Sequence, residues 1–145
     1  MRLVPLTRPL LDFILAMNRN DLESDLPKFG AVFSPGCAYA LMDAGELYGA
    51  GGIIPIWHGR AEGWLIVTRL ARPRDIVKGV RIAREWLDEK QQDPAFARLE
   101  FYLLAQAAWR ESFAAALDLF YLSTLRRWGP DGDDYCHYER VRAAT

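Results

Sequence analysis

The densest group of basic residues in the chain lies between positions 69 and 84. It comprises six side chains: Arg69, Arg72, Arg74, Lys78, Arg81 and Arg84. Guanidinium groups bind phosphate oxygens in pairs, and the free N–H groups at the start of a helix attract anions. A helix is predicted to begin within this group at Pro73, so the group is a candidate for binding phosphate. The alternative interpretation is a solvated helix face in which Asp75 is an ordinary acid of the first turn.

Two glutamates lie in segments that are predicted to be strands. Glu62 is near the start of an apolar segment, and a carboxylate there can remove a proton, directly or through water, if burial raises its pKa. A turn or edge charge is the commoner role of such a residue. Glu100 lies inside the apolar segment RLEFYLLA, where a carboxylate must be paired or face a cavity. Two roles stay open for Glu100: an ion pair with an arginine, and a place in the lining of a cleft.

The histidines and cysteines give weaker indications of a functional site. His58 follows the segment IIPIW, and a single histidine in a loop is usually solvated. Cys136 and His137 are adjacent, so in a strand they point to opposite faces and cannot form a thiol–imidazole pair. Cys37 and Cys136 form no C-x-x-C motif and have no histidine at metal-ligand spacing. The sequence therefore predicts two free thiols and no metal site.

Hydrophobic periodicity predicts the elements that position these groups. An antiparallel meander of three strands is expected within residues 38–68, followed by a helix over 73–90 and a strand over 98–105. A helix between two strands makes a crossover, which predicts parallel pairing of the strands at 61–68 and 98–105. Further strands are expected at 2–6 and 135–141, and further helices at 7–17, from Asn20 or Asp21, and at 109–117. Periodicity alone leaves residues 118–128 open between helix and strand.

Composition favours one α/β domain spanning residues 1–145. Apolar residues make up 51% of the chain, which is enough to bury a core without disulfides or metals. The 18 basic and 19 acidic side chains nearly cancel, which argues against binding nucleic acid or a membrane surface through overall charge. No segment has the pattern of a signal peptide or a membrane span, so the cytoplasm is the expected location.

The order of the elements resembles the GNAT superfamily of acetyltransferases over almost the whole chain. The segment EGWLIVTRLARPRDIVKGVRIAREWLD resembles the strand, loop and helix that bind acyl-CoA, and RLEFYLLA resembles the fifth strand. The ending STLRRWGPDGDDYCHYERVR is similar to the terminal hairpin of GNAT-like proteins of tailed bacteriophages and prophages. The resemblance implies a mixed, mostly antiparallel sheet of six to seven strands with a central parallel pair and about four helices. It also implies a strand at 119–128.

In this family the pantetheine arm of acetyl-CoA lies between strands four and five, and amides at the start of the next helix hold the pyrophosphate. The resemblance therefore implies that acetyl-CoA is held, without a metal, by Ile66, Val67, Thr68, Arg69, Arg72, Arg74, Asp75, Ile76 and Val77. The catalytic candidates are Glu62, Glu100 and Tyr121. Glu62 matches the neighbourhood of the family's general base, and Tyr121 is near in sequence to the place of its tyrosine acid.

The chain departs from the family pattern at two places. Where the family's phosphate loop reads Arg/Gln-x-x-Gly-x-Gly/Ala, Asp75 and Val77 stand at the two glycine positions. The usual tyrosine falls on Ala114, which cannot donate a proton. Two functions therefore stay open: an N-acetyltransferase for a small amine or a protein amino group, and a GNAT-shaped phage or prophage protein that has lost catalysis and serves in the virion or as a binding module. The edge of the terminal hairpin is compatible with a homodimer.

Overall fold

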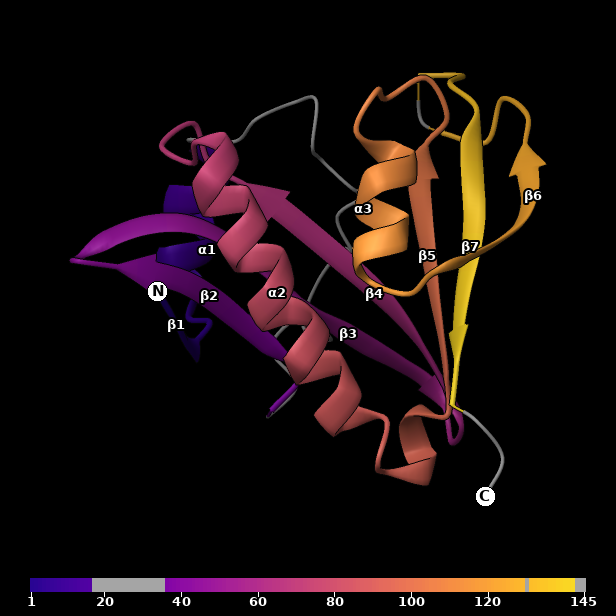
Figure 1. Ribbon diagram of the computed structural model, residues 1–145, viewed down its shortest axis with the longest axis horizontal. Coiled ribbons are helices and arrows are strands. Elements are labelled where there is room, and N and C mark those ends of the chain that lie inside the picture. Colours follow the sequence, from indigo (N-terminus) through magenta and orange to yellow (C-terminus); the bar gives the residue numbers. More distant parts are fainter. Residues whose placement is uncertain (17–35, 130, 143–145) are drawn as a thin grey trace.

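Seven strands form one mixed sheet in the computed structural model, which describes residues 1–16, 36–129 and 131–142 (Figure 1). The strand order is β1–β2–β3–β4–β5–β7–β6. The strands are β1 (Arg2–Pro5), β2 (Ala38–Asp43), β3 (Glu46–Trp57), β4 (Arg60–Val67), β5 (Arg98–Leu104), β6 (Phe120–Leu125) and β7 (Tyr135–Val141). The helices are α1 (Arg8–Ala16), α2 (Pro73–Lys90), the short 3₁₀ helix η3 (Pro94–Phe96) and α3 (Arg110–Ala116).

The pairing of the strands confirms the mixed sheet predicted from the sequence. β4 and β5 pair in parallel, as the crossover through α2 requires, and all the other neighbouring strands pair antiparallel. The segment that periodicity left open forms β6, as the family resemblance implied, although this strand ends at Leu125. The described residues contain three α-helices and η3, against about four helices expected. The helix expected from Asn20 or Asp21 lies outside the described residues.

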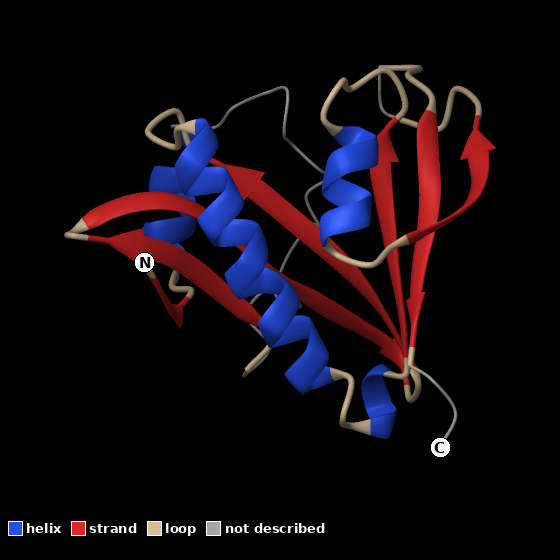
Figure 2. Cartoon of the chain, in the orientation of Figure 1, coloured by secondary structure: helices blue, strands red, loops and turns tan. Residues whose placement is uncertain are grey.

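Helices cover both faces of the sheet (Figure 2). On one face, Leu87 of α2 and Phe113 of α3 share a core with Phe101 of β5. On the other face, Ile14 of α1 packs with Ile66 of β4. Successive strand residues point to opposite faces, so the even-numbered residues of β4 and β5 point to the α1 side. None of the described helices is both long and apolar enough to cross a membrane.

A buried polar network fastens the C-terminal end of α2 to the sheet. Arg140 of β7 is buried, and its guanidinium group donates to the carbonyl oxygen of Leu117 at 3.0 Å and to the side chains of Gln91 and Asp88. The Gln91 amide in turn donates to the carbonyl oxygen of Arg140 at 2.9 Å. Because buried polar groups are costly when unpaired, this set of mutual hydrogen bonds fixes where α2 ends.

Candidate functional site

β4 and β5 separate soon after they begin. They pair at three positions only, and the last pair is Glu62 with Glu100. Beyond that pair, β4 continues to Val67 beside β3, whereas β5 continues beside β7. Figure 1 shows the two strands diverging toward their C-terminal ends. We call this gap the fork, with its vertex at Glu62 and Glu100 and its mouth at Val67 and the start of α2.

The vertex depends on a glycine that the sequence analysis did not single out. A Cβ atom added to Gly63 would lie 2.0 Å from Cε1 of Phe101, whose ring is buried there. Any side chain at position 63 would therefore displace the ring. The absence of a side chain at Gly63 lets Phe101 fill the place where the strands part.

The two predicted glutamates meet at the vertex, on the α1 side of the sheet. Glu100 is buried and receives hydrogen bonds from Arg60 and from Arg98, the latter at 3.2 and 3.3 Å. His137 Nε2 lies 3.2 Å from Glu100 Oε1 without hydrogen-bond geometry. Burial raises the pKa of Glu100, but the hydrogen bonds from the two arginines outweigh it and hold that pKa below its ordinary value. Of the two alternatives open for Glu100, the structure shows the ion pair.

Glu62 is less constrained than Glu100. Its side chain is 38% exposed, and its contact with Arg60 Nη2 is 3.6 Å long. The Glu62 carboxylate has access to solvent and one long cationic contact, whereas the Glu100 carboxylate is held as an anion by two arginines. Glu62 is therefore the more accessible and the less tightly paired of the two glutamates.

The mouth of the fork presents the main chain of Val67. The next residue, Thr68, donates its N–H to Tyr48 O at 3.0 Å and its hydroxyl to Leu47 O at 2.8 Å, both on β3. Peptide groups of successive strand residues point to opposite sides, so the groups of Ile66 also face β3 and those of Val67 face the fork. Of the three predicted strand residues, Val67 is thus the one whose backbone can pair with a ligand there.

Asp75 caps the start of α2 with its own carboxylate. Its Oδ2 atom accepts a hydrogen bond from the Arg72 N–H at 2.9 Å, and this bond holds the pKa of Asp75 below its ordinary value. The N–H groups of Asp75 and Ile76 donate to Arg72 O at 2.8 and 3.0 Å, and Pro73 has no N–H. Most donors that a phosphate would use are thereby bonded within the chain. Asp75 lies in the first turn of α2, as one of the two interpretations expected.

Basic side chains remain beside this capped helix start. Arg69, Arg72 and Arg74 are exposed, and the Arg72 side chain retains 62% of its accessible surface. Val77 is also exposed, whereas Ile76 packs against Val67 at the mouth. The residues present therefore fit an extended chain in the fork, and they offer a diphosphate side-chain charge in place of backbone amides.

Trp109 lies across the mouth, which the sequence did not predict. It precedes α3 and packs against the small cluster formed by Val67 and Ala71, and it contacts Phe113 edge to face at 5.5 Å between ring centroids. A contact between β4 and a residue some forty positions later leaves no local signal in a sequence. Trp109 is therefore an additional candidate for shaping the entrance of the fork.

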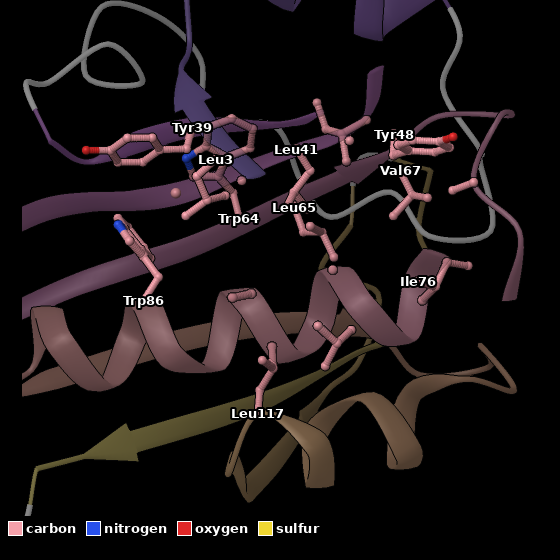
Figure 3. Close-up of a pocket in the computed structure, with 18 of the residues that line it drawn as sticks. Leu3, Tyr39, Leu41, Tyr48, Trp64, Leu65, Val67, Ile76, Trp86 and Leu117 are labelled. Atoms are coloured by element: carbon pink, nitrogen blue, oxygen red, sulfur yellow. The ribbon is translucent and has the colours of Figure 1, made fainter. Parts of the chain in front are cut away.

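An apolar cavity of about 90 Å³ lies between α2 and the sheet (Figure 3). Its lining extends from Tyr39 and Trp86 at one end to Val67 and Ile76 beside the mouth. Figure 3 shows Leu65 of β4 pointing toward α2 between these two ends. The cavity thus shares the side chains of Val67 and Ile76 with the mouth of the fork.

Tyr121 is the predicted residue that the structure does not bring to the fork. It lies on β6, which β7 separates from β5, and its hydroxyl contacts Thr124 Oγ1 at 2.7 Å. Its catalytic role stays a prediction that this position does not favour. Within the described residues, no group of three or more His, Cys, Asp or Glu side chains is arranged to hold a metal ion.

Several solved structures share this architecture. Spermidine N-acetyltransferase from Vibrio cholerae, in complex with CoA and spermine, matches with a TM-score of 0.74 at 15% identity, over 97% of this chain and 94% of that one. Ribosomal-protein-alanine N-acetyltransferase from Brucella melitensis matches with a TM-score of 0.73 at 15% identity, over 98% and 100%. The ribosomal-protein-S18-alanine N-acetyltransferase from Escherichia coli gives 0.73 at 13% identity, over 99% and 95%.

These likenesses establish the fold. The chain has the mixed GNAT architecture with its divergent parallel pair, as the order of elements predicted. No protein-family model matches the sequence, and no curated protein matches it.

Proposed function

We propose that the protein is a GNAT-type N-acetyltransferase that transfers an acetyl group from acetyl-CoA to an amine and acts as a homodimer. The observation that carries the proposal is the β4–β5 fork, in which pairing stops at Glu62 and Glu100 and the Val67 peptide faces the gap. The similar structures add support, because one is a spermidine N-acetyltransferase that holds CoA and spermine.

In this proposal the fork binds the extended arm of the cosubstrate. The main-chain groups of Val67 pair with an amide of that arm, and Trp109 packs beside it at the mouth. Arg69, Arg72 and Arg74 supply positive charge to the diphosphate, because the amides at the start of α2 are already bonded. Binding through flexible guanidinium groups predicts an affinity that falls as salt concentration rises.

Glu62 acts as the general base of the proposed reaction. It accepts a proton from the ammonium group of the acceptor, directly or through water, and leaves a neutral amine. The amine nitrogen forms a bond to the acyl carbon while the bond from that carbon to sulfur breaks. The sulfur leaves as a thiolate, and the proton that the acylated nitrogen releases passes to it through water, because Ala114 stands where the family has its tyrosine.

Asp75 favours a second candidate function. Its carboxylate occupies the helix start where a phosphate would bind, and it is buried there. A protein that keeps the GNAT shape while closing this position can serve as a binding module without transferring an acyl group. In that case the fork would retain its shape, and acetyl-CoA would not be consumed.

A transfer assay tests the proposal. Purified protein is incubated with acetyl-CoA and a panel of polyamines and peptides with free amino groups, and acetylated products are measured by mass spectrometry. Glu62→Gln is expected to lower the rate by about a hundredfold or more, whereas Glu46→Gln, an exposed glutamate at the start of β3, leaves it unchanged. Absence of transfer to every amine would favour the second candidate. Equal rates for Glu62→Gln and the wild type would remove Glu62 as the base.

A further inference from the structure

The two edges of the sheet are protected to different degrees. β1 forms one edge with four residues, beginning at Arg2 and ending at Pro5. Shortness, charge and proline all make an edge a poor template for another strand. β6 forms the opposite edge with the six residues FYLSTL, which include no charge and no proline. Its one irregularity is a register shift against β7 between Tyr121 and Ser123, which makes Leu122 the extra residue of the strand. Within the described residues, β6 pairs on one side only, with β7.

Large apolar side chains are exposed on both faces of β6. Phe120 is 70% exposed, Tyr121 55% and Leu122 41%. The Tyr121 ring contacts Tyr138 at 5.8 Å between centroids, whereas its neighbour Phe120 points to the other face. A strand added along β6 would therefore cover apolar surface above and below the sheet.

The charges that flank β6 indicate which strand fits. The exposed Asp118 precedes β6, and the exposed Arg126 and Arg127 follow it. A second β6 in antiparallel orientation would bring Asp118 of each copy beside Arg126 or Arg127 of the other. Asp118 already contacts Arg84 at 2.9 Å, but a carboxylate accepts several hydrogen bonds. Parallel addition would place like charges together.

We propose that β6 pairs antiparallel with β6 of a second copy of the chain, around a twofold axis near Leu122. Such an interface is self-complementary, because each copy contributes the same strand and the same two flanking charges. The dimer would join two seven-stranded sheets into one and would leave no unprotected β6 edge. The proposal specifies the interface of the homodimer and does not depend on acetyl transfer.

A groove beside the edge gives this dimer a further property. The groove has a volume of about 450 Å³ and is lined by residues of α3, β7 and β6, including Tyr121 and Thr124. A twofold axis that relates antiparallel edge strands runs perpendicular to the sheet, so both α3 helices lie on the same face. The grooves of the two copies would then lie on the same face of the joined sheet, one on each side of the paired strands.

Sedimentation velocity of the full chain over a wide concentration range tests the interface. The wild type is expected to dissociate from dimer to monomer on dilution. Leu122→Lys places like charges near the axis and is expected to give a monomer throughout. Val77→Lys replaces a residue that is 60% exposed on α2, far from β6 in the fold, and is expected to leave the dimer intact. A wild type that is monomeric at every concentration, or that associates only with a different protein, would overturn the proposal.

Cross-linking tests the orientation independently of affinity. Leu122→Cys is expected to give a disulfide-linked dimer under mild oxidation, because residues near a twofold axis face their own copies. Val77→Cys serves as the control and is expected to stay unlinked, and the native Cys37 and Cys136 are both buried. Equal cross-linking of the two variants, or none in Leu122→Cys, would contradict antiparallel pairing at β6.

Discussion

The vertex and the mouth of the fork are built in different ways. At the vertex, Glu100 is buried between arginines that come from two strands, and Phe101 fills the space above Gly63. At the mouth, the carboxylate of Asp75 bonds to a residue three positions away, and arginines beside it are exposed. Long-range buried contacts hold the vertex together. At the mouth, the polar groups form hydrogen bonds with residues nearby in the sequence, and the arginine side chains stay exposed to solvent. The comparison indicates that buried contacts at the vertex carry more of the stability, whereas the proposed binding of the diphosphate falls to the mouth.

The largest expected loss of stability follows from neutralising the vertex carboxylate. Glu100→Gln leaves the Arg60 and Arg98 guanidinium groups without their shared anion and is expected to lower the free energy of unfolding by about 3 kcal/mol. Glu62→Gln, at the same register but more exposed, should cost less than about 1 kcal/mol. Urea unfolding followed by circular dichroism measures both variants. Similar values for the two would show that the vertex does not depend on this buried ion pair.

Filling the vertex is expected to have the next largest effect. Gly63→Ala places a methyl group against the Phe101 ring and should lower the free energy of unfolding by about 1–3 kcal/mol. Phe101→Leu removes the ring, so the double variant should lose less than the sum of the two single changes. Thermal and urea denaturation of the three variants measure this coupling. If the losses of unfolding free energy in the two single variants simply added in the double variant, the contact between Gly63 and the Phe101 ring would be contradicted.

Acid should weaken the vertex through Glu100. Because arginine hydrogen bonds lower its pKa in the folded state from the ordinary value of 4.5, the unfolded chain binds more protons at low pH. The stability from this group is therefore present above that value and is lost as pH falls through the folded-state pKa. Wild-type stability is expected to fall more steeply than that of Glu100→Gln below about pH 5. The same pH dependence of the free energy of unfolding in the wild type and in Glu100→Gln would contradict the lowered pKa of Glu100.

A change at the mouth is expected to affect stability less than the loss of the buried vertex carboxylate. Asp75→Ala removes the capping hydrogen bond to the Arg72 N–H and should lower the free energy of unfolding by less than Glu100→Gln does. Glu85→Ala, at an exposed position in the middle of α2, serves as the control and should cost less than about 0.5 kcal/mol. Thermal unfolding compares the two. A loss at Asp75 as large as that of Glu100→Gln would erase the distinction between vertex and mouth.

Much of the fold could be predicted because its elements have clear local signals. The alternation in residues 38–68 and the amphipathic pattern of 73–90 predicted three strands and a helix, and the crossover rule then predicted the parallel pair. Element order resembling a known family supplied β6, which periodicity had left open. The presence of Glu100 in an apolar strand left an ion pair and a place in a cleft open, and only the structure shows its pairing with Arg60 and Arg98.

The site was less predictable because its decisive contacts are tertiary. Gly63 and Phe101 are 38 positions apart, and neither residue is unusual in a strand. Trp109 reads as an aromatic at the start of a helix, and its contact with Val67 depends on how α3 is placed over the fork. Tyr121 was chosen by its nearness in sequence to Ala114, but the turn before β6 takes it beyond β7. The spacing of residues along the sequence does not show where these side chains lie in the folded chain.

The most direct test of the account is a calorimetric titration of the protein with acetyl-CoA at low and moderate salt. The account predicts saturable binding that weakens with salt, weakens further in Arg72→Ala/Arg74→Ala, and strengthens in Asp75→Gly, which frees the Arg72 amide. Absence of binding by both the wild type and Asp75→Gly would contradict the assignment of the fork as an acyl-CoA site. Binding by Asp75→Gly alone would instead identify a transferase scaffold whose phosphate position has been closed.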